Sequence, residues 1–460
     1  MAGPVFAGRL AVFTTCNRAR LGMARAMLAS VRTHYPQAAL FICLVDAMDG
    51  VASLVGGQIV SAHDIDVPEW PALCMRMDAM GLCCVLKPFM MLNLLDRRFD
   101  AVVHLDSDIA LFGRIDSALD LLAAGAALVL TPHLLSPPGP GMLPDALAIL
   151  MAGVFNAGFF AARDAISARA ALQWWAEQVH RDCRAAPQQG MTWDQRWFDL
   201  LPGMFDDVAV SRDAGLNVAY WNVAQRGLVR TAAGWRVNGA PLGFFHFSGY
   251  SPAQPTRLTH YSWTQLPALA APVADLLAEY AALLAAHAVP AEASLPYAYG
   301  NFASGIPIPP AVRAMFADDH AMAEPDPFAH YEAHVNAPFR VTPRHPGGYV
   351  ATNLIAYLVR TDPQIGARVD LLTTEGVRAA VRRAAACGAI SGPFLAAATP
   401  GLDAAARAAL RHADADAPDC GAVSDLTLRH NALLRSTSWR ITAPLRALAT
   451  GLRRLVGPSR

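Results

Sequence analysis

The stretch that most constrains how this chain can fold runs from Ala101 to Phe112 and reads AVVHLDSDIALF. Its first residues are apolar and β-branched, a composition typical of a buried strand in a parallel sheet. Asp106 and Asp108 follow two positions apart, so their carboxylates project to the same side of an extended chain. Because open α/β sheets bind ligands beyond the carboxyl ends of their strands, we expect this pair to line a ligand site.

Two carboxylates placed in this way suit a hard divalent cation. Mg²⁺ and Mn²⁺ take oxygen ligands in near-octahedral geometry and keep positions free for phosphate oxygens. A metal held there can neutralise a departing diphosphate, which sugar transfer from a nucleotide donor requires. Surface loops also contain Asp-x-Asp, so it is the apolar lead-in, more than the pair alone, that favours a metal site.

The composition favours a folded chain with balanced charge. Hydrophobic residues make up 54% of the 460 positions, charged residues make up 16%, and the formal net charge is zero. Such a balance argues against a general nucleic-acid binder. The first residues lack the basic start and long apolar run of a secretory signal. We therefore expect a cytoplasmic protein, with any membrane contact peripheral and at the inner face of the membrane.

The order of expected elements indicates the fold class. A strand over 10–14, a helix over 21–33 and a strand over 40–45 form a βαβ unit, which requires parallel strands and a right-handed crossover. We expect an α/β fold with a mixed, mainly parallel sheet flanked by helices, followed by a smaller, mainly helical C-terminal region. The expected divisions are a catalytic domain over 1–262, a helical accessory domain over 263–425 and a basic tail over 426–460.

The basic tail contains seven arginines and no acidic residue. Leu445, Leu448, Leu452 and Leu455 recur within it at helical spacing. A basic amphipathic helix of this kind can lie on an anionic membrane surface. A solvated helix that caps the second domain fits the same pattern equally well.

Lys87 is the only lysine in the chain. We expect a helix over 86–95, with Lys87 and Pro88 in its first turn, where proline is tolerated. The free N–H groups of a helix start favour anions, and a compact ammonium could complete the neutralisation of a phosphate. The alternative is a surface lysine at a helix end.

Seven segments, in this order, resemble bacterial sugar-nucleotide glycosyltransferases of the GT-A fold, near glycosyltransferase family eight. The resemblance covers roughly 10–252, and its order makes it more specific than any one motif. The segments are Thr14–Arg18, Leu86–Pro88, His104–Asp108, Phe155–Phe159, Trp193–Gln195, Leu216–Asn222 and Phe245–Gly249.

The resemblance implies that Asp106, Asp108 and His246 hold the metal, and a neutral imidazole beside two carboxylates suits Mn²⁺. Taken alone, His246 between phenylalanines is more typical of a core histidine. The resemblance also implies a nucleotide-sugar site built from Thr14, Thr15, Asn17, Arg18, Lys87, Ser107, Asn156, Gly158 and Gly249. Taken alone, the segment 14–18 would be an ordinary polar turn before a helix.

Asp194 and Gln195 match the pair that lies near the reacting carbon in this family. The resemblance implies that Asp194 orients the sugar or the acceptor and that the Gln195 carbonyl stabilises an oxocarbenium-like transition state. Alternatively, Asp194 caps a helix expected over 191–201. The family carries a lysine near the position of Pro252, so Lys87 or Arg257 is expected to supply that charge here.

The resulting hypothesis is a metal-dependent, retaining glycosyltransferase that uses Mn²⁺ or Mg²⁺. Its expected donor is a nucleotide-sugar, most simply a UDP-sugar, and its expected acceptor is a glycan or a lipid-linked glycan of cell-surface polysaccharide biosynthesis. Two alternatives stay open: an inactive scaffold of the same fold in a polysaccharide-assembly complex, and a glycoside hydrolase. A hydrolase places its two carboxylates on either side of the glycosidic bond, which Asp106 and Asp108 fit less well.

Overall fold

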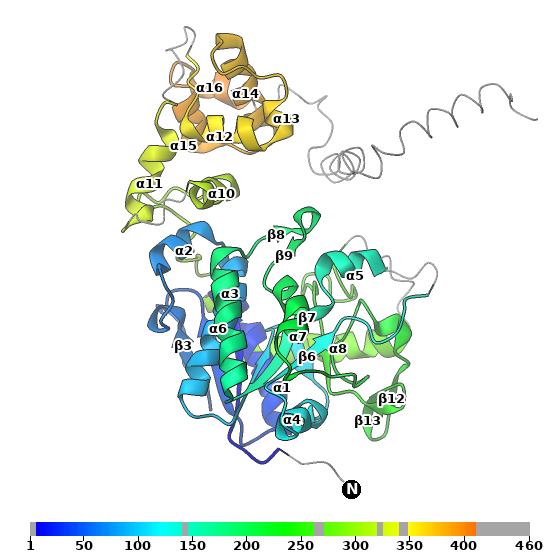
Figure 1. Cartoon of the computed structure of the whole chain (residues 1–460). Helices are drawn as coiled ribbons and strands as arrows, with labels where there is room; N and C mark the ends of the chain where they lie inside the picture. Colours follow the sequence, from blue (N-terminus) through cyan, green and yellow to red (C-terminus); the bar gives the residue numbers. More distant parts are fainter. Residues whose placement is uncertain (1–5, 140–145, 262–270, 320–324, 340–347, 411–460) are drawn as a thin grey trace, which may run out of the picture. The chain divides into compact units, whose positions relative to one another are not determined.

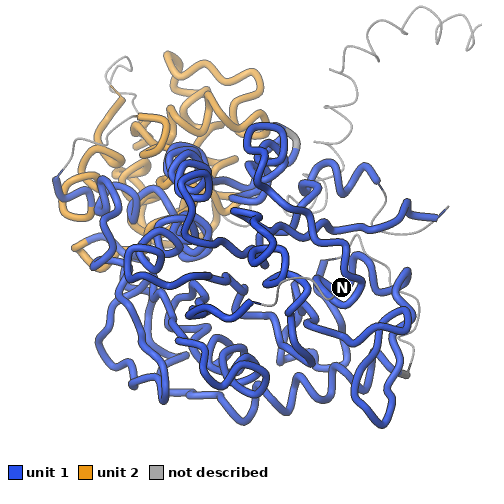
Figure 2. The backbone as a smooth tube through the Cα atoms, turned by 60° about the horizontal axis from the view of Figure 1, so that its bottom comes forward, with its two compact units in different colours: residues 1–302, 321–327 blue, residues 303–320, 328–460 orange. Residues whose placement is uncertain are grey.

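The computed structural model describes residues 6–139, 146–261, 271–319, 325–339 and 348–410 (Figure 1). The chain divides into two compact units (Figure 2). The first unit comprises Met1–Phe302 and Ala321–Pro327, and the second comprises Ala303–His320 and Phe328–Arg460. The tail over 426–460 lies outside the described residues, so the amphipathic helix expected there stays a prediction.

Seven strands form the central sheet of the first unit, in the order β10-β6-β7-β4-β1-β2-β3. All neighbouring pairs are parallel except those of β7, which runs antiparallel to both β4 and β6. This topology confirms the mixed, mainly parallel sheet expected from the sequence. The strands are β1 (Leu10–Cys16), β2 (Ala39–Leu44), β3 (Gln58–Ser61), β4 (Ala101–Leu105), β6 (Leu128–Pro132), β7 (Phe155–Arg163) and β10 (Val208–Val210).

Helices cover both faces of this sheet because alternate strand residues point to opposite sides. Val12, Ile42 and Val103 pack in one apolar cluster with α1 (Leu21–His34) and α4 (Asp116–Ala123). On the other face Phe160 makes an edge contact with Trp175 of α6 (Ile166–Arg181), at 5.1 Å between ring centroids. Helix α3 (Ala79–Asp96) packs against β1, β4 and α6 on this second face.

Helix α3 begins well before the position that the sequence indicates. Asp78 caps it by accepting a 2.8 Å hydrogen bond from the Gly81 amide, so Lys87 and Pro88 lie in its interior and the predicted helix start at Leu86 is wrong. Among the described residues, α3 is the one helix long and apolar enough to cross a membrane. Most of it is buried in the first unit, as in a core helix.

A second, smaller sheet joins distant parts of the chain in the order β11-β15-β5. Strand β15 (Phe244–His246) pairs antiparallel with β5 (Ile109–Leu111), and His246 lies opposite Ile109. Strand β11 (Val218–Ala219) pairs parallel with β15. This sheet therefore places His246 beside the acidic pair that precedes β5.

The first unit continues beyond the boundary expected at residue 262. Tyr280 of α8 (Ala271–His287) stacks on Phe247 with 3.7 Å between ring centroids. The buried Glu292, in α9 (Pro290–Ala293), pairs with Arg25 of α1 and accepts a 2.8 Å hydrogen bond from the Ala52 amide. Both contacts bind the segment 271–302 to the sheet domain.

Shorter elements connect the sheets. These elements are α2 (Trp70–Arg76), α5 (Ala146–Ala152), β8 (Ala185–Ala186), β9 (Met191–Thr192), η4 (Gln195–Leu200), α7 (Leu201–Met204), β12 (Leu228–Thr231), β13 (Gly234–Val237) and β14 (Ala240–Pro241).

The helix expected over 191–201 is not formed as one helix. Its first residues end the β8–β9 hairpin, and the following residues form the 3₁₀ helix η4, so that expectation is wrong.

The second unit is helical over its described residues, as expected for the C-terminal region. Val312, Phe316, Ile355 and Val377 are fully buried in it. Its helices, of which α11 begins at the unit boundary, are α10 (Pro310–Asp318), α11 (Pro327–Asn336), α12 (Asn353–Thr361), α13 (Pro363–Gly366), α14 (Thr374–Ala386), α15 (Gly392–Ala398) and α16 (Ala404–Leu410).

Candidate functional site

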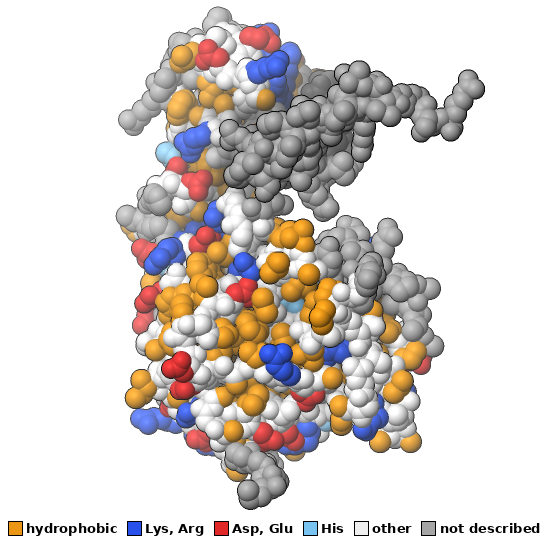
Figure 3. Space-filling model, turned by 45° about the vertical axis from the view of Figure 1, so that its right-hand side comes forward, with side chains coloured by type: hydrophobic (Ala, Val, Ile, Leu, Met, Phe, Trp, Pro, Cys, Tyr) orange, Lys and Arg blue, Asp and Glu red, His pale blue; other side chains and the backbone are white. Residues whose placement is uncertain are grey.

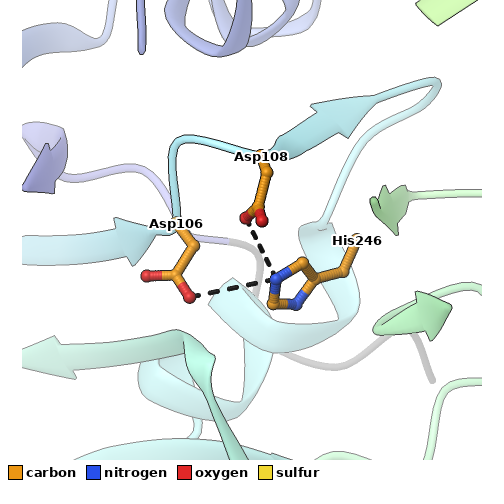
Figure 4. A group of neighbouring side chains, drawn as sticks. All are labelled: Asp106, Asp108 and His246. Atoms are coloured by element: carbon orange, nitrogen blue, oxygen red, sulfur yellow. Dashed lines mark ion pairs between the residues drawn. The ribbon is translucent and has the colours of Figure 1, made fainter. Parts of the chain in front are cut away.

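Asp106, Asp108 and His246 come together at the carboxyl end of β4 (Figure 4). The His246 Nε2 atom lies 3.1 Å from Asp108 Oδ1 and 3.9 Å from Asp106 Oδ2. One ligand atom from each of the three residues lies within 4.8 Å of the others, a spacing that one cation can bridge. The structure thus brings together the three residues for which the sequence resemblance implies metal binding.

Asn156 and Gly158 of β7 set the orientation of the His246 ring. The His246 Nδ1 atom lies 3.1 Å from Asn156 Oδ1, which leaves Nε2 facing the two carboxylates. An imidazole whose other nitrogen is held in this way has a fixed tautomer and a fixed ring plane, as metal-binding histidines usually do. A Cβ at Gly158 would lie 2.4 Å from His246 Cε1, so only glycine leaves room for the ring.

The charges of this group suit a cation. Burial would raise the pKa of Asp108, but the charge of His246 and its hydrogen bond prevail and lower that pKa to about 2. Asp108 is therefore a carboxylate throughout the neutral range. Two acidic oxygens and one imidazole nitrogen form a mixed donor set that suits Mn²⁺ and also accepts Mg²⁺.

Lys87 lies beside this group. It contacts Asp106 of the acidic pair and Asp194 of the predicted catalytic pair. Its Nζ atom lies 3.1 Å from Asp106 Oδ1 and 3.0 Å from Asp194 Oδ2. Nζ also donates a 3.1 Å hydrogen bond to the Ala157 carbonyl. Three oxygen atoms of the described residues, one each from Asp106, Asp194 and Ala157, therefore surround the Lys87 ammonium. Burial lowers the pKa of Lys87, but Asp106 and Asp194 outweigh it and hold the pKa well above its usual value.

Asp194 and Gln195 follow the β8–β9 hairpin and enter η4. Trp193 before them has a φ of 48°, a left-handed conformation that costs a bulky residue about 1–2 kcal/mol. The Trp175 indole donates a 3.2 Å hydrogen bond to the Asp194 carbonyl and so fixes this turn. The Gln195 Nε2 atom donates to the Ala152 carbonyl at 2.7 Å, and its Oε1 lies 3.4 Å from Asn156 Nδ2.

The residues of the first strand-to-helix turn have mixed surroundings. Thr15 donates a 2.9 Å hydrogen bond to the Cys83 carbonyl, and Thr14 Oγ1 is buried without a hydrogen-bond partner among the described residues. Asn17 precedes a 3₁₀ turn without capping it through its side chain. The Arg18 guanidinium is buried, pairs with Asp46 at 3.2 Å and donates to the Pro296 carbonyl. Arg18 thus holds the segment after α9 against this turn.

Two further predicted residues occupy tight turns. Ser107 lies buried between the two aspartates at the end of β4. Gly249 has a φ of 76°, and a Cβ there would lie 2.4 Å from Thr259 Oγ1. Glycine at 249 is therefore required by backbone conformation as well as by space.

The sequence analysis assigned no role to two buried neighbours of the site, although both lie in the segments 104–108 and 216–222. Trp221 makes an edge contact with His246, at 5.2 Å between ring centroids. His104 is completely buried, and its Nε2 lies 3.8 Å from Asp106 Oδ1. A histidine in a strand otherwise made of apolar residues was the available signal for the second.

No protein-family model matches the chain. Two curated proteins are similar to it in sequence over part of their length. The uncharacterized protein YfnF of Bacillus subtilis (strain 168) is 25% identical over 181 residues, which are 38% of this chain and 58% of YfnF. The uncharacterized protein YfnD of the same organism is 26% identical over 196 residues, 42% of this chain and 61% of YfnD. The chain thus spans less than two thirds of either relative.

Several solved glycosyltransferase structures align with the chain at low identity. The galactosyltransferase LgtC, solved with donor and acceptor sugar analogs, is 15% identical with a TM-score of 0.35, over 59% of this chain and 95% of LgtC. GlyE of Streptococcus pneumoniae TIGR4 is 15% identical with a TM-score of 0.35, over 64% of this chain and 66% of GlyE.

Proposed function

We propose that this protein is a glycosyltransferase of the GT-A type that transfers a sugar from a nucleotide-sugar donor with the help of a divalent metal. One observation carries the proposal. Asp106, Asp108 and His246 form a metal-sized cluster at the carboxyl end of a parallel strand, beside the Lys87–Asp194 pair. Ligands of open α/β sheets bind at such strand ends.

Each group then has a chemical role. Asp106, Asp108 and His246 would hold Mn²⁺ or Mg²⁺, which supplies positive charge for the leaving diphosphate. Asn156 orients His246 through its Oδ1 and faces Gln195 through its Nδ2. The Lys87 ammonium lies between Asp106 and Asp194 and compensates the negative charge of the two carboxylates. This compensation matters because the diphosphate of the donor would add further negative charge there.

The arrangement around Asp194 favours a retaining reaction without a carboxylate nucleophile. The Asp194 carboxylate is bound to Lys87, so we assign it to orienting a sugar hydroxyl. The Gln195 side chain is half-buried, and its Oε1 atom lies next to Asn156, where its lone pairs can stabilise an oxocarbenium-like transition state. UDP as the nucleotide follows from the sequence resemblance and belongs to this proposal.

The surface beside the site supports an acceptor with an apolar part, such as a lipid-linked glycan at the inner face of the membrane. Helix α5 has no buried residue, and its Leu147, Leu150 and Met151 are exposed. Its carboxyl end is bound to the catalytic segment, because Gln195 and Thr192 donate to the carbonyls of this helix. Figure 3 shows hydrophobic side chains, in orange, exposed among polar and charged ones on the face in view.

A panel of UDP-sugars tested with Mn²⁺ and with EDTA decides the proposal. At a hundred times its dissociation constant, a true donor should stabilise the protein by about 2.7 kcal/mol in thermal unfolding. Its turnover should stop in EDTA and in Asp108→Asn, and continue in Asp64→Asn, which changes a carboxylate of the exposed surface. Metal and donor binding without turnover would instead establish the scaffold alternative, and cleavage of simple glycosides the hydrolase alternative.

A further inference from the structure

His104 is a buried polar side chain without a hydrogen bond. It lies on β4, two residues before Asp106, and it is 0% exposed. Its ring lies between Phe13 on β1, at 4.9 Å, and Phe160 on β7, at 5.0 Å between centroids. Neither ring nitrogen has a hydrogen-bond partner among the described residues.

A buried side chain of this kind destabilises the fold, so its presence calls for a role other than packing. Burying a polar group without a hydrogen-bond partner is unfavourable, because the group loses its bonds to water and gains none in return. The site between two phenylalanines would accept a third aromatic ring without any polar atom. The imidazole therefore brings a cost that its packing alone does not require.

The position of the ring relates it to Asp106. The Nε2 atom lies 3.8 Å from Asp106 Oδ1, a separation slightly longer than a hydrogen bond. Lys87 Nζ lies 3.1 Å from the same oxygen, while the other oxygen, Oδ2, faces His246. His104 and Lys87 thus approach one oxygen from the protein side, and the second oxygen is left for the metal.

We propose that His104 is a positioning residue that donates Nε2–H to Asp106 Oδ1 when the carboxylate binds the metal, and that it thereby fixes the direction of Oδ2. The inference rests on the proposed metal site. A ligand carboxylate that is itself hydrogen-bonded keeps its geometry, and loss of such outer partners typically costs 10–100-fold in metal affinity. In the metal-free protein the His104 ring makes no hydrogen bond, and this unfavourable state is what the gain in metal affinity would offset.

The test uses the full chain and two measurements: Mn²⁺ affinity by titration calorimetry, and thermal unfolding without metal. His104→Phe should weaken Mn²⁺ binding at least tenfold, whereas its metal-free unfolding temperature should stay equal to or rise above that of the wild type. His104→Gln, which keeps a donor, should recover most of the affinity. Metal affinity therefore falls without a loss of stability, a combination that a merely structural role does not produce.

Phe160→Leu serves as the control, because it loosens the packing around the same ring without removing a nitrogen. It should lower the unfolding temperature and leave the Mn²⁺ affinity within about twofold of the wild type. An unchanged affinity in His104→Phe overturns the inference while the metal site stands. If the wild type itself binds no Mn²⁺, the proposed metal site is overturned together with the inference. Should His104→Phe fail to fold, His104→Leu replaces it in the same comparison with His104→Gln.

Discussion

The Nζ atom of Lys87 lies 3.0 Å from Asp194 Oδ2 and so joins the only lysine of the chain to a predicted catalytic carboxylate. The same atom lies 3.1 Å from Asp106 Oδ1. One buried ammonium therefore connects the proposed metal-binding residues to the proposed catalytic pair. Breaking a buried ion pair on one side leaves a carboxylate without compensation, so the link is expected to matter for folding as well as for turnover.

Lys87→Met should lower both stability and activity. We expect at least a tenfold loss in kcat/KM, equivalent to about 1.4 kcal/mol, and a lower unfolding temperature, because Asp106 and Asp194 lose their shared counter-charge. Lys87→Arg should recover only part of either, since a planar fork cannot replace a compact ammonium between two carboxylates. Steady-state kinetics and thermal unfolding of the three proteins give the comparison.

The double variant Lys87→Met/Asp194→Asn separates the two effects. Removing both charges should restore part of the stability lost in Lys87→Met, with a coupling free energy of about 0.5–3 kcal/mol. It should not restore activity. Additive losses in the double-mutant cycle would show that the contact between Lys87 and Asp194 contributes nothing to stability.

Gly158→Ala should abolish metal binding with little loss of the sheet. The added Cβ would lie 2.4 Å from His246 Cε1 and 2.7 Å from Asn156 Oδ1, so the imidazole must leave its position between them. Calorimetric titration with Mn²⁺ should detect no binding under conditions where the wild type saturates. Gly203→Ala is the matched control, since a Cβ at that glycine meets no atom within 4 Å. Equal Mn²⁺ affinity in Gly158→Ala would show that His246 is not a ligand.

Glu292→Gln should destabilise the first unit in a pH-dependent manner. Burial raises the pKa of Glu292, but its hydrogen bonds to Arg25 and to the Ala52 amide prevail and hold that pKa below the usual 4.5. A carboxyl whose pKa is lowered in the folded state stabilises the fold above its unfolded pKa, and this contribution is lost as the pH falls through the folded value. We therefore expect a loss of roughly 1.5–3 kcal/mol at pH 7.

The same measurement at lower pH supplies its own control. Below the folded pKa of Glu292 both proteins carry a neutral side chain at this position, so their unfolding temperatures should converge. Denaturation curves at pH 7 and at acidic pH measure the difference. A gap that persists unchanged at low pH would mean that the introduced glutamine disturbs packing and that the charge of Glu292 is not the cause.

Deletion of the residues after Asp425 should weaken binding to anionic vesicles. The deleted segment carries seven arginines and no acid, and each basic side chain near an anionic surface contributes about 1 kcal/mol. Turnover of a water-soluble acceptor should stay nearly unchanged. Co-sedimentation with phosphatidylserine-containing and with neutral vesicles tests this, and equal sedimentation of both forms with the anionic vesicles would contradict it.

The sequence by itself determined the first strands of the central sheet and the place of the acidic pair at the end of one of them. The apolar run before Asp106 predicted a buried strand, and the strand–helix–strand order near the N-terminus predicted parallel pairing; the central sheet has both. These patterns are local, since the apolar composition of a strand and the order of neighbouring elements are read from residues that are close in sequence. The ordered motifs also indicated His246 and Asn156 as companions of Asp106 and Asp108.

Only the tertiary structure decided how distant side chains meet. Lys87 was expected in the first turn of a helix, beside a phosphate, but α3 begins at Ala79 and buries the ammonium between two carboxylates from other segments. The unit boundary similarly depends on α8 and on Glu292, which pack against residues early in the chain. The sequence marks His104 as a polar residue in an apolar strand, but only the structure places its Nε2 atom 3.8 Å from Asp106 Oδ1. Ion pairs, buried cations and unsatisfied rings are set by packing between segments, and local periodicity carries no information about that packing.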